Sequence, residues 1–413
     1  MKRFLKRGEN FLFSLIVFLI PSQLGYHFFI KSSYVYGIRI DYLAPTIYLT
    51  DILILALFIF CLARVQKIKI KPWALALGGF ALINLSTSNF SAASIYKWIK
   101  VGEAIFFGYY VFSKRNLLIK KRVLPPLALS VIVFSVIGIV QFFLQRSIGG
   151  LLYFLGERTF SSTTPGISLF TVFGRQFLRP YSTFSHPNSM AGFMLVAVLF
   201  LLSLANSASN RIIRTSLVFG IFSILISASL SSILAFITMG IFRFLMIYRR
   251  GFASKIIHVF LPFLMVFSIF LPLVARTYLK AGDSVVGENI KKRLILAEVV
   301  GKNFSDSPIW GIGLNNFIPK LLSSGRLPEL AWWLQPVHNI FLLTLAEAGL
   351  IGLVILFLLF QKAIISAIRF SGATVFPLLA IFLTGYADHY WLTLQQNEIL
   401  LSFILGLSFR RTL

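Results

Sequence analysis

The chain alternates long apolar runs with short polar breaks from one end to the other. A helix needs roughly 17 to 25 mostly apolar residues to cross the hydrocarbon core of a bilayer, and the runs repeat at about this scale. The pattern predicts twelve membrane-spanning helices. They cover residues 11–30, 46–62, 73–87, 97–112, 123–144, 189–205, 213–227, 230–247, 256–275, 339–360, 373–386 and 395–408.

The first apolar run follows a basic segment and could therefore be a signal peptide. No small-residue cleavage site comes after it, so we expect a helix that stays in the chain. With 57% hydrophobic and 13% charged residues, the composition lies outside the range of soluble domains. We predict an all-α polytopic membrane protein, with residues 1–413 forming a single integral membrane domain.

The basic residues refine this topology. With the N-terminus inside, the short inner loops hold most of the Lys and Arg, as the positive-inside rule requires. Two long outer segments, residues 145–187 and 276–338, are also rich in Lys and Arg, against the usual bias. The second is predicted to be a long extracytoplasmic loop with short helices, including an amphipathic helix over 283–304 and a turn over 307–317. Outward-facing basic clusters either contact anionic headgroups or hold an anionic ligand.

Two predicted spans begin with similar polar residues. His186, Pro187 and Asn188 precede the span at 189–205, and His338 and Asn339 stand at the start of the span at 339–360. Both helix N-termini face outward in this topology. Asn is a good N-cap, and a helix N-terminus attracts phosphate through its unpaired N–H groups and its dipole.

Each of these helix starts follows a basic outer segment. Arg179 lies seven residues before His186, and Arg293 lies in the loop that leads to His338. Arginine forks match phosphate oxygens and histidine titrates near neutral pH, so the combination suits a pyrophosphate with a nearby proton transfer. The alternative is that these residues only cap helices or anchor them to headgroups.

Other polar positions fit more than one interpretation. Asp388 and His389 lie between the last two spans and either line an acceptor cleft or belong to a capped interfacial loop. Three acids inside spans, Asp51, Glu103 and Glu347, are left out of the site because they could equally form packing pairs. The His and acidic residues show no metal-ligand spacing, so no metal and no cofactor are expected.

The spacing around His338 resembles a known family. His338 and Asn339 are followed after nine residues by Gly349 and Gly352, which is similar to the H-N-x9-G-x-x-G pattern of the O-antigen ligase and O-antigen polymerase superfamily. Further features of that family stand in order along the chain: Arg179, Pro187 and Asn188, then Arg293, then the turn residues Pro308, Gly311 and Gly313.

The resemblance implies a metal-independent glycosyltransferase with a GT-C-like fold. It would move a glycan from undecaprenyl diphosphate to an acceptor at the outer face of the plasma (inner) membrane. By the same resemblance Arg179 and Arg293 would hold the donor pyrophosphate, together with His186, Asn188 and Asn339, and His338 would be the catalytic base. Its partners would be the lipid-linked glycan, membrane lipids and a glycan, lipid or protein acceptor, with no nucleic acid.

One position departs from the family pattern. Family members often carry a Ser-Arg pair near the turn between the seventh and eighth spans, whereas residues 226–232 of this chain read ISASLSS. Another basic residue, such as Arg175, could compensate for the missing arginine.

Three other functions remain open at this stage. A protein O-oligosaccharyltransferase of the same superfamily shares the donor and differs in its acceptor, as a ligase and a polymerase differ from each other. A twelve-span secondary transporter or flippase is the alternative from another class. Transporters usually show related halves and polar groups near mid-membrane, whereas the two halves of this chain are unlike and its polar residues gather near span ends.

Overall fold

The computed structural model describes residues 2–63, 72–88, 91–118, 122–204, 211–248, 261–273, 287–326, 328–330, 333–370 and 372–409, and it is mostly helical. Every predicted span falls on a helix, although only 261–273 of the ninth lies within the described residues. These helices are α1 Lys2–Leu19, α2 Leu49–Leu62, α3 Pro72–Ser86, α4 Ser91–Leu118, α5 Leu124–Leu144, α6 Pro187–Leu204, α7 Arg211–Ile226, α8 Leu230–Tyr248, an unlabelled helix at Leu261–Leu273, α12 Ile340–Phe370, α13 Val375–Gly385 and α15 Gln395–Ser408.

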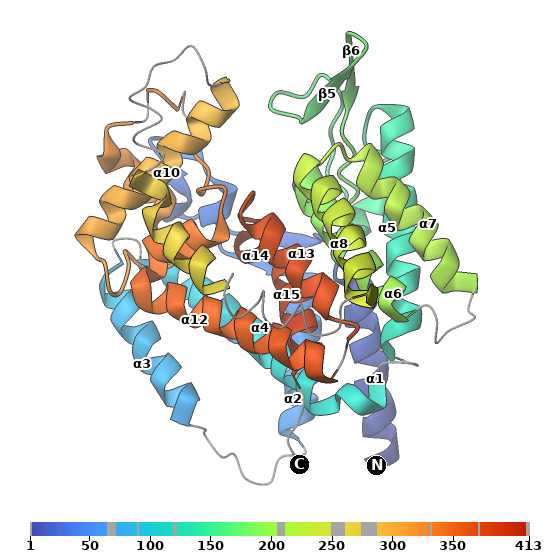
Figure 1. Ribbon diagram of the computed structural model, residues 1–413. Helices are drawn as coiled ribbons and strands as arrows, with labels where there is room; N and C mark the ends of the chain where they lie inside the picture. Colours follow the sequence, from blue (N-terminus) through green and yellow to red (C-terminus); the bar gives the residue numbers. More distant parts are fainter. Residues whose placement is uncertain are drawn as a thin grey trace.

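Three helices of the described residues, α5, α6 and α12, are long and apolar enough to cross a membrane. Several other apolar helices are shorter, so the membrane class is supported while the number of twelve spans stays a prediction. Both chain ends lie at one end of the molecule (Figure 1). The opposite end carries a hairpin, formed by β5 Leu169–Val172 and β6 Arg175–Leu178, and the helix α10, Glu288–Asp306. We call it the loop end.

The described residues are mostly helical with little strand, as the all-α prediction expects, but the bounds of the first helix differ. The first helix ends at Leu19 rather than near residue 30, because Pro21 cannot continue a helix. The segment that follows forms short antiparallel pairs, and residues 169–178 form a third. The strands are β1 Gly25–His27 with β4 Thr46–Tyr48, β2 Tyr34–Val35 with β3 Ile38–Arg39, and β5 Leu169–Val172 with β6 Arg175–Leu178.

The long loop before α12 contains the short helices that the sequence predicts. Its amphipathic helix is α10, Glu288–Asp306, close to the predicted 283–304, of which residues 283–286 lie outside the described residues. A second short helix, α11, spans Phe317–Leu321, and α14, Tyr390–Thr393, follows α13. Whether this loop faces the outside stays a prediction.

The glycine motif of the sequence has a structural role. Gly349 interrupts α12 with φ 66° and ψ −166°, a backbone conformation that glycine adopts without the penalty of a side chain. The turn at Pro308 to Gly313 fills the break: Gly313 N donates to Glu347 O at 3.0 Å, and Leu350 N donates to Pro308 O at 2.9 Å. These hydrogen bonds attach the loop to the middle of α12, about three helical turns after His338.

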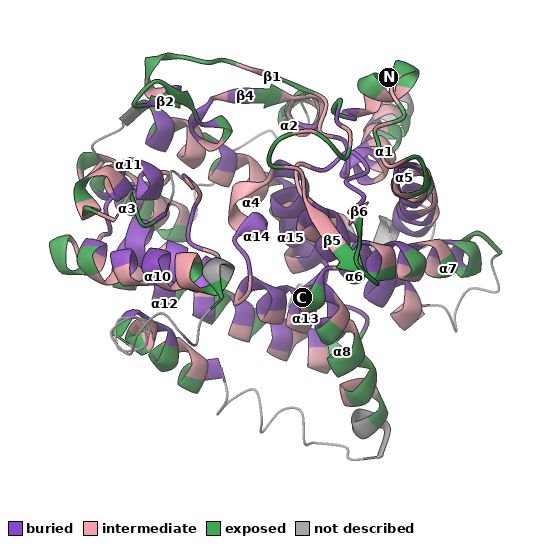
Figure 2. Ribbon diagram, turned by 90° about the horizontal axis from the view of Figure 1, so that it is seen from above, coloured by how far each residue is buried: buried purple, intermediate pink, exposed green. Residues whose placement is uncertain are grey.

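The centre of the molecule is formed by the last helices and α6. Seen from the loop end, α14 and α15 lie between α10 and α12 on one side and α5 to α7 on the other (Figure 2). Most of α6 is buried from Pro187 to Leu201. The starts of α6 and α12 thus reach the loop end on either side of α14.

Candidate active site

Three chain segments meet at the loop end and bring their polar residues together. The segment before α6 supplies His186, the segment before α12 supplies His338, and the connection between α13 and α14 supplies Asp388 and His389. All four line one cavity of about 340 Å³, together with Tyr42 and residues of the loop after α5. The sequence placed these residues at one surface, and the structure places them in one cavity.

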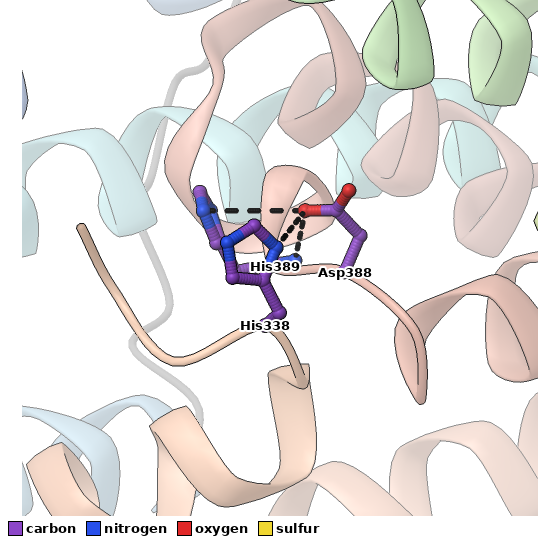
Figure 3. Close-up of side chains that lie close together, drawn as sticks. All are labelled: His338, Asp388 and His389. Carbon is purple, nitrogen blue, oxygen red and sulfur yellow. Dashed lines mark hydrogen bonds and ion pairs between the residues drawn. The ribbon is translucent and has the colours of Figure 1, made fainter. Parts of the chain in front are cut away.

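His338 and Asp388 form a close pair. His338 Nδ1 lies 3.4 Å from Asp388 Oδ1, and both side chains are largely buried (Figure 3). The backbone N–H of His389 donates to the same carboxylate oxygen at 2.8 Å, and His389 Nε2 lies 4.0 Å from it. A carboxylate beside one imidazole nitrogen orients the ring and favours a proton on that nitrogen.

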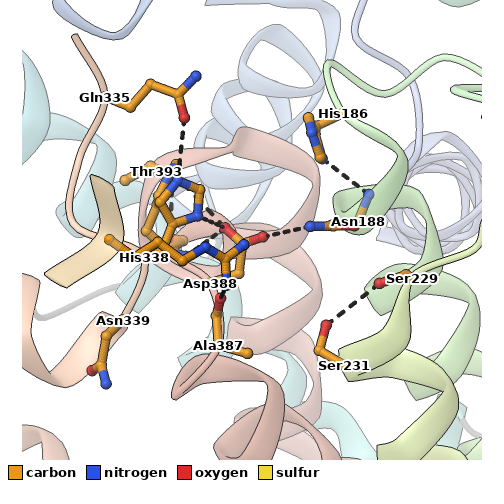
Figure 4. A network of polar contacts seen from close by, with 12 residues as sticks. His186, Asn188, Ser229, Ser231, Gln335, His338, Asn339, Ala387, Asp388 and Thr393 are labelled. Atoms are coloured by element: carbon orange, nitrogen blue, oxygen red, sulfur yellow. Dashed lines mark hydrogen bonds and ion pairs between the residues drawn. The ribbon is translucent and has the colours of Figure 1, made fainter. Parts of the chain in front are cut away.

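The other side of Asp388 is tied to Arg179 through an amide. Asn188 Nδ2 donates to Asp388 Oδ2 at 2.9 Å (Figure 4). Arg179 Nη2 donates to Asn188 Oδ1 at 2.5 Å. Arg179 also donates from Nη1 to Ser168 and from Nε to the backbone oxygen of Ser227. A continuous polar chain therefore runs from Arg179 to His338.

Two residues before α12 hold the imidazole ring of His338, one at its Nε2 atom and one against its face. Gln335 Oε1 lies 3.2 Å from His338 Nε2, and the Trp333 ring stacks on the imidazole with centroids 5.0 Å apart. His389 is held in turn by Thr393, whose Oγ1 lies 2.7 Å from His389 Nδ1. These contacts leave each imidazole in a defined orientation, which proton transfer requires.

Two further arginines approach the cavity. Arg293 of α10 is exposed and donates from Nη1 to the backbone oxygen of Ala387 at 3.4 Å, beside Asp388. Arg158 lines the cavity and donates from Nη2 to Ser185 O at 2.8 Å. Arg158 belongs to the basic segment 145–187, and no motif around it in the sequence marks it as a site residue.

Asn339 is used differently from Asn188. Its Oδ1 accepts from the backbone N–H groups of Phe341 at 2.8 Å and Leu342 at 3.0 Å. This confirms the predicted N-cap of α12. The side chain lies away from the pair of His338 and Asp388 (Figure 4), so its predicted contact with pyrophosphate stays a prediction.

The turn between α7 and α8, where the family arginine is missing, is contacted by Arg179. Arg175 lies exposed at the start of β6 in the protruding β5–β6 hairpin (Figure 1). Arg179 instead reaches the turn between α7 and α8 through its bond of 2.7 Å to Ser227 O. The cation at this turn thus comes from the segment before α6.

The protonation states follow from burial and neighbouring charge. Burial lowers the pKa of His186 to about 4 and that of His389 to about 3, although Asp388 opposes both shifts. Burial by itself would raise the pKa of Asp388. The nearby imidazoles of His338, His389 and His186 reverse this and hold that pKa well below its usual range. At neutral pH the cavity therefore holds an ionised Asp388 beside a neutral His186 and His389.

One group among the described residues also has the ligand types of a metal site. Ligand atoms of His338, Asp388 and His389 lie within 4.8 Å of one another. Sequence spacing missed this group because His338 lies fifty positions from Asp388. The same geometry suits proton transfer between the two imidazoles and the carboxylate.

Residues 215–358 match the family model described as O-antigen ligase. The match confirms the resemblance to the O-antigen ligase superfamily that the motif around His338 indicated. At this level it supports a membrane enzyme of ligase or polymerase type. The matched segment includes Arg293 and His338, whereas Arg179, Asn188 and Asp388 lie outside it. No curated protein matches the chain.

Proposed function

We propose that the protein transfers a glycan from undecaprenyl diphosphate to an acceptor hydroxyl at the outer face of the plasma membrane, with a GT-C-like fold and without a metal ion. The observation that carries this proposal is the pair of His338 and Asp388, joined through Asn188 to Arg179. It sets a proton acceptor beside cations that suit a diphosphate.

His338 acts as the general base. In the neutral ring the proton lies on Nδ1, which faces Asp388. The acceptor hydroxyl displaces Gln335 Oε1 from Nε2, and the Nε2 lone pair then takes the hydroxyl proton. The acceptor oxygen bonds to the anomeric carbon of the donor. The bond from that carbon to the diphosphate breaks, and its electron pair leaves on undecaprenyl diphosphate.

The arginines stabilise the charge on the leaving diphosphate. A guanidinium has five N–H groups, and Arg179 uses three in its bonds to Ser227, Ser168 and Asn188. Two N–H groups remain for phosphate oxygens. Arg293 adds a second cation beside Asp388, and charge neutralisation of this kind lowers the barrier to departure of the diphosphate.

The neighbouring residues complete the site. Asn188 holds Asp388 and Arg179 at a fixed separation, and His186 lines the same cavity. Asp388 and His389 also form a wall of the acceptor cleft, as the sequence analysis suggested as one of two interpretations. The acceptor is a glycan, a lipid or a protein.

A reconstituted assay tests the function. The purified protein in lipid nanodiscs is given an undecaprenyl-diphosphate-linked oligosaccharide, and glycan transfer and release of undecaprenyl diphosphate are measured. Arg179→Ala should lower transfer by about 10- to 100-fold, because a hydrogen bond to a charged group contributes roughly 1.5 to 3 kcal/mol. Arg175→Ala is the matched control. Arg175 belongs to the same segment but is exposed on the hairpin, so this variant should transfer the glycan at the normal rate.

Several outcomes would contradict the proposal. Movement of the lipid-linked glycan across vesicles without transfer would indicate a flippase or transporter. Loss of activity in EDTA, restored by a divalent cation, would show that the three clustered ligands hold a metal.

A deletion strain identifies the acceptor within the proposed function. Short glycan chains would indicate a polymerase, long chains left on the carrier would indicate a ligase, and unmodified protein would indicate an O-oligosaccharyltransferase.

A further inference from the structure

A second cavity of about 300 Å³ lies between α4 and α12 and extends from the middle of these helices to the active site. Along α4 its lining runs from Tyr96 to Ile105, nine residues or roughly 14 Å at the helical rise. Along α12 it continues to Leu359. This depth is close to half the hydrocarbon core of a bilayer, which is about 30 Å.

The α4–α12 cavity and the active-site cavity share a lining residue and therefore adjoin each other. Tyr42 lines both of them, and its ring packs edge-on against His389 at 5.5 Å. Thr393, which contacts His389 Nδ1, lines the α4–α12 cavity as well. A long molecule in the α4–α12 cavity would therefore place one of its ends beside the cavity that holds His338.

The charges in the α4–α12 cavity are already engaged by other protein groups. Lys97 pairs with Glu398 at 2.8 Å, and Lys100 pairs with Asp51 and, at 3.5 Å, with Glu103. Glu347 accepts from Phe317 N at 3.1 Å. Among the described lining residues, no cation is left over to bind a phosphate, and the remaining walls are mainly aliphatic and aromatic side chains.

We infer that the α4–α12 cavity binds the apolar chain of a lipid-anchored acceptor, whose sugar hydroxyl then reaches His338. This inference rests on the proposed function, because that function assigns the donor diphosphate to Arg179 and Arg293. Those cations belong to the segment before α6 and to α10, and neither of them lines the α4–α12 cavity. An uncharged chain fits the neutralised walls, and the base at the cavity mouth needs an acceptor rather than a leaving group.

Photolabelling tests the inference directly. The probe is a diazirine-bearing dodecyl glucoside, added to the protein in phosphatidylethanolamine and phosphatidylglycerol nanodiscs, with labelled peptides mapped by mass spectrometry. Labels should concentrate on α4 and α12. Leu356→Trp fills the cavity and should lower this labelling about tenfold, equivalent to 1.4 kcal/mol of binding. Leu358→Trp is the matched control, because Leu358 is exposed on the same helix and does not line the cavity.

A second pair of variants protects the test against misfolding of the first. Ile105→Trp fills the cavity from α4, and Ile99→Trp adds the same bulk at an exposed position of that helix. Labelling that is equal in all four variants would overturn the inference. Loss of labelling confined to Leu356→Trp and Ile105→Trp would support it.

Competition separates the acceptor from the donor. Excess unlabelled dodecyl glucoside should remove the label, whereas excess undecaprenyl diphosphate should not. Displacement by undecaprenyl diphosphate would assign the cavity to the donor chain and overturn the inference. A protein that labels in the cavity as expected but transfers no glycan would instead refute the proposed function while leaving a lipid site in place.

Discussion

The two helix starts at the loop end carry the same residue types and use them in opposite ways. At α6, Asn188 enters the site and links Arg179 to Asp388, while His186 accepts a hydrogen bond from the Asn188 backbone at 3.1 Å. At α12, His338 enters the site and pairs with Asp388, while Asn339 caps the helix. Similar local sequences therefore do not imply similar roles, because the role is set by what each side chain faces.

The largest expected effect separates the two histidines. His338→Ala should lower transfer by about 100- to 10,000-fold, the range of a lost general base, while His186→Ala should leave most of the activity. The nanodisc transfer assay measures both variants at equal protein amounts in the membrane. His27→Ala serves as a control, since His27 lies in the β1–β4 pair outside the site. Equal losses of transfer activity in the His338 and His186 variants would show that the two histidines do not differ in role.

The next effect concerns the amide in the site. Asn188→Ala removes the link between Arg179 and Asp388 and should lower the turnover rate by about 10- to 100-fold, as expected for hydrogen bonds to charged groups. Thermal stability in detergent should change much less than activity. Unchanged turnover in this variant would show that the link does not position the site.

The matched change at the other helix start should have the opposite signature. Asn339→Ala removes the cap of α12 and should cost about 0.5 to 2 kcal/mol of stability, with the turnover rate largely kept. Unfolding in detergent and the transfer assay are compared side by side. A loss of donor affinity in this variant, without loss of stability, would instead favour the predicted contact of Asn339 with the pyrophosphate.

The smallest effect is a pH dependence of stability. His186, with a pKa of about 4, stays neutral in the folded protein while an unfolded histidine gains a proton near pH 6.5. The unfolded chain thus binds more protons, so this contribution to stability is complete above about pH 6.5 and is lost as the pH falls toward 4.

Thermal unfolding of the wild type and of His186→Gln between pH 7.5 and 5 measures the pH effect. The slope of stability against pH should be smaller in the variant, because one of three histidines with lowered pKa values is removed while His27 and His389 remain. An identical slope would mean that His186 is accessible to protons in the folded state.

Much of the fold was predictable because it depends on local patterns. Apolar length located the helices, the Asn at position 339 predicted the cap of α12, and the glycine motif pointed to residues that the structure uses to break α12 at Gly349. The predictions were wrong where local rules compete: Pro21 ends α1 early, and the residues after it form short strands.

The site was predictable as a set of residues but not as an arrangement. The sequence indicated His338, Asp388 and Asn188 separately, yet the bond from Asn188 to Asp388 spans 200 positions. The supporting residues Gln335 and Trp333 carried no signal of their own, because an interfacial Gln or Trp is common near a membrane. Partners at such separations are set by helix packing, which no local spacing encodes.

The sequence by itself therefore determined the class of the protein, the approximate positions of its helices and the cap of α12, since burial of apolar surface in a bilayer and helix capping depend on nearby residues. The tertiary structure decided which histidine faces Asp388, which asparagine joins Arg179 to it, and that an apolar cavity ends at this site. The physical reason is that α6, α12 and α14 must pack together before these side chains come within reach of one another.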